Sequence, residues 1–305
     1  MKNQTTFGHV AVIFTNIVWG TTFISTKLLL EYFDPIEILF IRTVIGFLAL
    51  CAAYPHRMKI TDRKQELIFA LAGLTGSCMY FLLENIALTY TMASNVGVIL
   101  AVAPCFTAMM MHLFFRGEEK LQWNFFAGFL VAMIGICFIS FNGSKLQLNP
   151  VGDILAVLAA LVWALYAVQV RKISSFGYHT IQNTRRIFAY GLFFMIILAP
   201  FFDISIQPSD FAHTVCIFNL LYLGLGASAL CFVTWNFGVK VLGAVKTSLY
   251  IYMGPIVTVL TSMIVLHEKI TLMAAMGTCL TLAGLIISEG LWRNIKKIKT
   301  SDLCL

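Results

Sequence analysis

The sequence predicts an all-helical integral membrane protein with ten transmembrane helices arranged as two inverted five-helix repeats. Three observations support this fold class: an apolar composition, ten apolar windows of membrane-spanning length, and a match between the two halves of the chain. Of the 305 residues, 59% are hydrophobic and 11% are charged, whereas roughly a quarter of the residues in soluble domains are charged. The composition therefore excludes an ordinary soluble protein.

The apolar residues fall into windows of about 20 residues, the helical length that crosses a hydrocarbon core of about 30 Å. The ten windows are 8–30, 35–54, 67–90, 94–115, 123–141, 153–171, 181–202, 214–239, 247–266 and 270–292. The segments between them are short, so no extramembrane catalytic domain is expected. No A-x-A cleavage site precedes Lys27, and we expect the first helix to be retained rather than removed as a signal peptide.

Charge is distributed unevenly over the loops. With a cytoplasmic N-terminus, nearly all loop lysines and arginines, from Lys2 and Arg57 to Lys299, lie on the cytoplasmic side, and the opposite loops hold only Lys145 and Lys269. This positive-inside bias predicts a multi-pass protein of the cell inner (cytoplasmic) membrane with both termini in the cytoplasm. The same bias accounts for the net charge of +7, so nucleic acid is not an expected partner.

The second half of the chain repeats the first, with offsets that change only where loops fall. The matched pairs are Trp19 with Trp163, Lys27 with Arg171 and Arg42 with Arg186 at an offset of 144, and Gly73 with Gly224, Asn85 with Asn236 and Pro104 with Pro255 at 151. We divide the chain into repeats 1–145 and 146–292 and a basic cytoplasmic tail, 293–305. Because each repeat has an odd number of windows, the second must be inverted, which predicts a site near the midplane between the halves.

The run "IALTYTMASNVGVILAVAPCFTAMMMHLFFRGEEKLQWNFFAGFLVAMIGICFIS", residues 86–140, resembles the drug/metabolite transporter superfamily, EamA type. The resemblance is carried by an alanine-leucine-tyrosine-threonine turn, a helix of small residues, a proline, a glutamate, and glycines seven residues apart. Residues 237–288 follow the pattern more loosely, with Lys240 and Val241 at the alanine and tyrosine-threonine positions. The resemblance covers nearly the whole chain and implies transport of an amino acid, nucleotide sugar, phosphorylated sugar, cofactor or drug.

Candidate cavity residues lie on helical faces that carry aromatic and polar side chains. Trp19, Thr22, Phe23 and Lys27 share one face of the first window, and the resemblance places the first and sixth helices around the cavity. Aromatic surfaces with a few polar groups are typical of a small-molecule site. The predicted substrate-binding residues are Trp19, Thr22, Phe23, Tyr80, Glu84, Trp163, Tyr166, Trp235 and Tyr252.

Four cations have two open interpretations. Lys27 and Arg171 lie near helix ends, where a long side chain either reaches the head groups or contacts a substrate. Arg42 and Arg186 lie deeper, where an arginine is costly unless it meets a carboxylate, carbonyls or water. Each is expected to be a structural link or a contact to an anionic substrate group, and the sequence favours the structural role.

Glu84 is the acid placed most clearly inside a window. Its counterpart in the second repeat is Trp235, at an offset of 151, so this acid does not belong to the duplicated scaffold. Acids within membrane helices are functional candidates by default. Glu84 is therefore predicted to bind an ammonium-bearing substrate, to take up a coupling proton, or to form a structural bond with Arg42.

Other features concern helix geometry. Pro104 and Pro255 are predicted to kink the fourth and ninth helices. The stretches "GFLVAMIG" and "GTCLTLAG" place Gly128, Gly135 and Gly277, Gly284 one heptad apart, where helices can approach closely. By the resemblance, these glycines pack the two halves or adjacent helices together.

The functional prediction is a secondary transporter that exports a small organic metabolite, most simply an amino acid or related compound, by alternating access. Alternatives are an exchanger of nucleotide sugars, phosphate esters or cofactors, a multidrug exporter, or a membrane-embedded binding protein. The sequence has no paired nucleophile and base and no metal cluster, so we expect no enzyme, no cofactor and no metal site. Expected partners are the solute, the lipid bilayer and coupling protons, in a monomer or weak homodimer.

Overall fold

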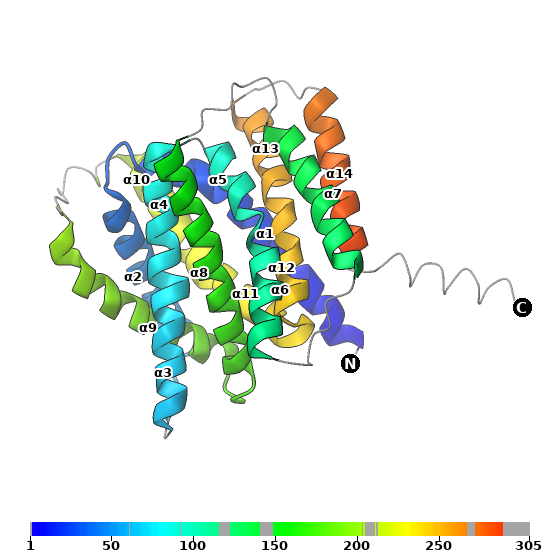
Figure 1. Ribbon diagram of the computed structural model, residues 1–305. Helices are drawn as coiled ribbons and strands as arrows, with labels where there is room; N and C mark the ends of the chain where they lie inside the picture. Colours follow the sequence, from blue (N-terminus) through cyan, green and yellow to red (C-terminus); the bar gives the residue numbers. More distant parts are fainter. Residues whose placement is uncertain are drawn as a thin grey trace, which may run out of the picture.

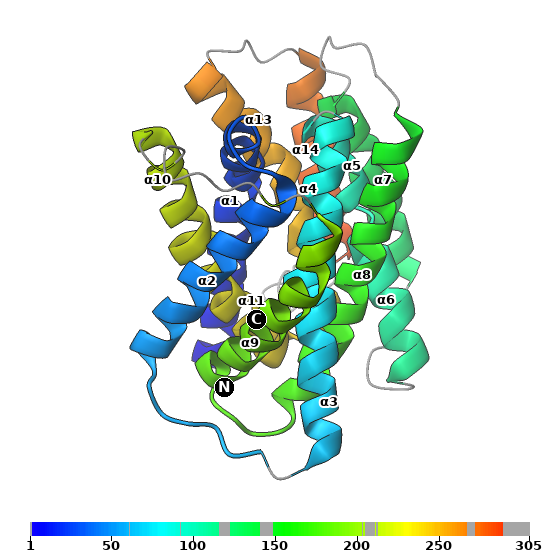
Figure 2. The ribbon, with the colours of Figure 1, turned by 90° about the vertical axis from the view of Figure 1, so that its left-hand side faces the viewer.

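The computed structural model describes residues 2–60, 62–91, 93–115, 123–140, 149–202, 204, 211, 213–266 and 272–288. Within these residues every regular element is a helix, and most helices run roughly parallel in one bundle (Figure 1, Figure 2). The elements of the first half are α1 Lys2–Leu29, α2 Pro35–Ala53, α3 Arg63–Ala72, η1 Gly73–Met79, α4 Tyr80–Tyr90, α5 Ala93–Leu100, α6 Ala103–Phe114 and α7 Trp123–Ser140. Those of the second half are α8 Pro150–Ser174, α9 Thr180–Leu198, η2 Ala199–Phe201, α10 Thr214–Leu221, η4 Tyr222–Leu230, α11 Cys231–Leu242, α12 Ala244–Leu249, η5 Tyr250–Tyr252, α13 Met253–Leu266 and α14 Leu272–Ser288.

Seven helical stretches in the described part of the chain are long and apolar enough to cross a membrane: Gln4–Leu29, Pro35–Ala53, Arg63–Tyr90, Val96–Phe114, Pro150–Ser174, Thr180–Phe201 and Thr214–Leu242. Two shorter apolar helices, Trp123–Phe138 and Ala275–Ser288, fall in the predicted windows 123–141 and 270–292. The window 247–266 is divided among α12, η5 and α13. The prediction of an all-helical membrane protein is confirmed, while the count of ten spans and the inversion stay predictions.

Two helices begin at a proline that follows a capping residue. At the start of α2, the backbone nitrogen of Asp34 donates to Glu37 Oε2 at 2.8 Å, so the carboxylate satisfies an amide at the helix end. At the start of α8, Asn149 Oδ1 accepts from the nitrogen of Val151 at 3.2 Å. Local sequence thus fixes where these helices begin.

A π-helical segment interrupts the third long helix of each half: η1 lies between α3 and α4, and η4 between α10 and α11. Each segment packs against a helix of the opposite half, η1 against α9 and η4 against α2. A Cβ added to Gly73 would lie 2.6 Å from the carbonyl oxygen of Ile187, and one added to Gly224 would lie 2.5 Å from Ile45 Cγ2. Glycine is therefore required at both crossings.

The glycine heptads join the last helices of the two halves. α7 and α14 lie side by side (Figure 1). A Cβ on Gly135 would lie 2.6 Å from the carbonyl oxygen of Gly277, and one on Gly284 would lie 2.6 Å from that of Gly128. The prediction that these glycines pack the two halves together is confirmed.

Candidate functional site

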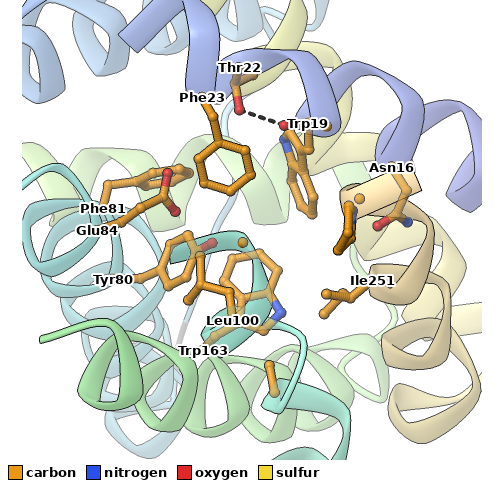
Figure 3. A pocket seen from close by; sticks show the side chains of 15 residues that line it. Asn16, Trp19, Thr22, Phe23, Tyr80, Phe81, Glu84, Leu100, Trp163 and Ile251 are labelled. Atoms are coloured by element: carbon orange, nitrogen blue, oxygen red, sulfur yellow. Dashed lines mark hydrogen bonds between the residues drawn. The ribbon is translucent and has the colours of Figure 1, made fainter. Parts of the chain in front are cut away.

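A cavity of about 660 Å³ lies among helices of both halves. This volume includes space that is open to solvent, so it is an upper bound on the room for a bound molecule. Figure 3 shows aromatic side chains from α1, α4 and α8 directed into a common space. The described wall consists of Asn16, Trp19, Gly20, Thr22, Phe23, Tyr80, Phe81, Glu84, Gly97, Leu100, Ala103, Trp163, Ile251, Gly254 and Pro255.

One face of α1 forms a side of the cavity. Asn16, Trp19, Gly20 and Phe23 follow at helical spacing. The indole Nε1 of Trp19 donates to the carbonyl oxygen of Ala227 at 3.0 Å, which anchors the ring to η4. The hydroxyl of Thr22 donates to the carbonyl oxygen of Trp19 at 2.7 Å (Figure 3). The polar groups of this face are thus largely satisfied by the protein, and its aromatic surface is what a bound molecule would contact.

α4 supplies the opposite side and the charge. Glu84 lies one turn after Tyr80 on the same face, and in the described wall it is the only Asp, Glu, Lys, Arg or His residue. Its side chain is 4% exposed. The ring of Tyr80 lies between Glu84 and Trp163 in Figure 3, with its centroid 4.7 Å from that of Trp163. The cavity therefore offers one carboxyl group bordered by aromatic rings.

Arg42 lies outside the wall but close to it. Its side chain is 1% exposed, Nε donates to Ser228 Oγ at 3.0 Å, and Cζ lies 4.2 Å from the ring centroid of Phe81. Among the described residues, Arg42 and Glu84 form no direct ion pair, and Arg42 Nη2 has no hydrogen-bond partner. The guanidinium group of Arg42 therefore packs on Phe81, a wall residue, from outside the cavity.

Aromatic rings form the floor of the cavity. The ring of Trp163 lies 5.3 Å from Trp19, 5.3 Å from Trp235 and 5.0 Å from Tyr166. Beneath them the hydroxyl of Tyr166 donates to Asn236 Oδ1 at 2.8 Å, and Asn236 Nδ2 donates to Thr184 Oγ1 at 3.0 Å. Asn236 also lines a smaller hollow of about 240 Å³ beside Ser174, Thr180, Asn183 and Lys240. The aromatic floor and its polar chain thus separate two hollows.

The structure brings six of the nine predicted substrate-binding residues into the wall: Trp19, Thr22, Phe23, Tyr80, Glu84 and Trp163. The other three do not line the cavity. Tyr166 and Trp235 lie in the floor, with Tyr166 committed to Asn236. Tyr252 is buried in a separate cluster with Ala108 and Phe125, because the short helix η5 turns Ile251, rather than Tyr252, toward the cavity.

None of the four predicted cations is in the wall. Lys27 Nζ donates to the carbonyl oxygen of Leu88 at 3.3 Å, which joins the ends of α1 and α4. Arg171 is half-buried in the last turn of α8. Arg186 pairs with Glu66, whose carboxylate also accepts from the hydroxyl of Tyr190. Pro104 follows a break at Ala101 and Val102, and Pro255 lies in the wall near the start of α13.

The wall also contains residues that the sequence argument missed. Asn16 lies one turn before Trp19, so extending the face of α1 backwards would have found it. Gly97, Leu100 and Ala103 recur every three residues and carry no chemistry that distinguishes them from core residues. Phe81 was hidden beside Tyr80, because a continuous apolar run does not show which neighbour faces inward.

Membrane-length helices around an aromatic cavity with one carboxyl group are typical of a multi-span membrane protein that binds a small molecule. Comparison with known proteins then places this chain: it belongs to the EamA-like transporter family, whose model matches residues 6–141 and again residues 150–289. One matched range lies in each half of the chain. The protein is accordingly a transporter and not an enzyme.

Individual relatives are similar over most of their length. An uncharacterized transporter of Archaeoglobus fulgidus is 26% identical over 294 residues, 92% of this chain and 96% of that protein. The uncharacterized transporter YdfC of Bacillus subtilis is 25% identical, covering 88% of this chain and 86% of its own. A probable terminal-alkyne amino-acid exporter of Streptantibioticus cattleyicolor is 24% identical, covering 91% of each chain. One crystal structure superposes with a TM-score of 0.73 at 19% identity, over 97% of this chain and 99% of that one, which shows the fold.

Proposed function

We propose that this transporter is a secondary exporter of a small organic solute with an apolar or aromatic body and an ammonium group, an amino acid or related compound. The observation that carries this proposal is the composition of the cavity wall. It combines the rings of Trp19, Phe23, Tyr80, Phe81 and Trp163 with a single carboxyl group and no described lysine or arginine.

The chemistry of the wall favours an amine over an anion. A carboxylate in a water-poor cavity attracts an ammonium group strongly, and aromatic faces add cation–π attraction within about 6 Å of a ring centroid. A phosphate or sugar phosphate would meet Glu84 with no described cation in the wall to offset the repulsion. The exchanger of phosphate esters or nucleotide sugars is therefore the weaker alternative.

The two hollows on either side of the aromatic floor support alternating access. In this mechanism the solute occupies the larger cavity, and the halves then rock so that Trp163, Tyr166 and Trp235 separate and the opposite side opens. The positive-inside bias supports a cytoplasmic-membrane location with cytoplasmic termini. The amino-acid exporter among the relatives supports the outward direction. Glu84 is the residue through which a proton gradient would be coupled.

The test is counterflow of solute in liposomes that contain the purified full chain. Labelled aromatic amines and amino acids are compared with sugar phosphates, for the wild-type protein, Glu84→Gln and the matched control Glu31→Gln, an exposed acid outside the cavity. We expect flux of the ammonium-bearing solutes, loss of at least about tenfold in Glu84→Gln because a charge-assisted contact is removed, and no change in Glu31→Gln.

Three outcomes decide against parts of this proposal. Binding without flux at any imposed gradient would indicate a membrane-embedded binding protein. Flux of sugar phosphates but not amines would assign the anion-exchanger function instead. Flux that is retained in Glu84→Gln but no longer responds to a pH gradient would limit Glu84 to proton coupling.

A further inference from the structure

A third hollow, of about 540 Å³, lies away from the central cavity and shares none of its described wall residues. It is bounded by α2, the segment 54–60 that follows it, and the first turns of α9. Figure 2 shows α2 and α9 side by side, with the segment after α2 running beneath them. Three arginines, Arg57, Arg185 and Arg186, lie in this groove together with Phe47, Met58 and Ala189.

The groove is held in shape by contacts between the segment 54–60 and α9. Arg185 donates from Nη1 to the carbonyl oxygen of Tyr54 and from Nη2 to that of His56, both at 2.6 Å. Gln182, also in the groove, donates to the same His56 oxygen at 3.3 Å. The rings of Tyr54 and His179 stack with centroids 4.5 Å apart and an interplanar angle of 4°. A polar network of this kind pre-organises a site before anything binds.

The groove is rich in positive charge. The groove has three guanidinium groups, and that of Arg186 pairs with the carboxylate of Glu66. Arg57 is exposed and makes no hydrogen bond or ion pair with the part of the chain that the structure describes. Guanidinium groups bind phosphate oxygens through paired hydrogen bonds, so Arg57 is available for an anionic phosphate group.

The other side of the groove is apolar and continues onto a membrane-facing surface. Phe47 and Ala189 lie several residues inside their helices, Ala189 about 13 Å along the axis from the start of α9. Farther along α9, Phe193, Ile196 and Ile197 are exposed, as expected for side chains that contact acyl chains. A charged end next to an apolar track matches an amphipathic lipid better than a soluble anion.

We propose that this groove binds the head group of an anionic phospholipid, with the phosphate at Arg57 and the acyl chains along α2 and α9. Lys59, Arg63, Lys64 and Lys172 belong to the loops and helix ends of the same predicted membrane side, which by the positive-inside bias is the cytoplasmic side. Anionic lipids are concentrated in that leaflet, and basic pockets between membrane helices bind their head groups. The occupied groove stabilises the contact between the segment 54–60 and α9.

The experiment measures the melting temperature and native mass spectrum of the detergent-purified full chain at 0.15 M salt, where diffuse attraction is largely screened. Phosphatidylglycerol is the probe, phosphatidylcholine tests the head-group charge, and inorganic phosphate and glycerol phosphate test a free anion. Arg57→Gln is compared with Lys59→Gln, which removes an exposed charge from the same segment but does not line the groove.

We expect phosphatidylglycerol to bind and raise the melting temperature, and Arg57→Gln to weaken that affinity by about tenfold, the loss of one charge-assisted contact. Lys59→Gln should change it by about twofold or less. Equal losses of affinity in the two variants would show that general surface charge attracts the lipid, and they would overturn the proposed site at Arg57. An equal response to phosphatidylcholine, or an equal shift with inorganic phosphate, would overturn the anionic lipid as the ligand.

Discussion

A buried arginine stands beside the cavity wall, and its packing predicts its role. Arg42 contacts Phe81 through its guanidinium face and Ser228 through Nε, so it supports the wall without lining it. We expect Arg42→Ala to lower the free energy of unfolding by about 2–4 kcal/mol, from the lost packing and the lost hydrogen bond. Arg42→Met should lose less, because methionine retains much of the volume.

Thermal or denaturant unfolding of the purified variants measures these changes, with Ser228→Ala as the control that removes only the hydrogen bond, about 1–2 kcal/mol. Normal unfolding of Arg42→Ala combined with selective loss of solute binding would instead make Arg42 a contact of the solute. That result would restore the second interpretation that the sequence left open.

Tyr166 tests the polar chain under the aromatic floor. Tyr166→Phe keeps the ring but leaves Asn236 Oδ1 buried without its donor, which should cost about 1–3 kcal/mol of unfolding free energy. The control is Tyr178→Phe, whose hydroxyl donates to Gln65 at a partly buried position and can be replaced by water. Equal, small effects of the two substitutions would show that water already reaches Asn236.

At the scale of elements, the contact between α7 and α14 leaves no room for a side chain at Gly135. A Cβ there would lie 2.5 Å from the backbone nitrogen of Thr281, and backbone cannot move aside as a side-chain end can. We expect Gly135→Ala to lower the melting temperature by several degrees, with an unfolding cost of about 1–3 kcal/mol.

Gly226→Ala is the matched control for this substitution. Its Cβ would meet nothing nearer than Tyr222 Cδ2 at 3.6 Å, an ordinary contact. If Gly135→Ala melted at the wild-type temperature, the two helices would have to be farther apart in the membrane than they are here. A larger effect at Gly226 than at Gly135 would contradict the packing argument altogether.

Elements of this chain could be predicted from the sequence because bilayer thickness sets the helix length and apolar windows show it directly. The side of α1 that lines the cavity could also be predicted, since Trp19 and Phe23 recur at helical spacing. The π-helical segments were not, because they depend on how η1 and η4 pack against the opposite half. For the same reason Tyr252 was misplaced in the cavity: its side-chain direction follows from the short turn of η5, which hydrophobicity does not encode.

At the scale of the whole molecule, the central cavity and the smaller hollow beside Asn236 should open to opposite sides of the membrane. Gly97→Cys places a thiol in the larger cavity, where a Cβ at this position has nothing within 4 Å. Ser174→Cys places one in the smaller hollow. In a background whose native cysteines are replaced, we expect an impermeant maleimide to label the two positions from opposite sides, and solute to protect only Gly97→Cys. Labelling of both cysteines from the same side of the membrane would show that the aromatic floor does not separate the two hollows.

The contacts that η1 and η4 each make with a helix of the opposite half also affect how the protein folds during synthesis. α2 of the first half packs on η4 of the second, and α9 of the second packs on η1 of the first. Gly46 and Gly224, which approach each other at one crossing, are 178 residues apart in the chain. At a synthesis rate of about 5–20 residues per second, α2 waits about 10 to 40 seconds before its partner emerges. The first half of the chain therefore cannot complete its tertiary contacts until η4 and α9 have been synthesised.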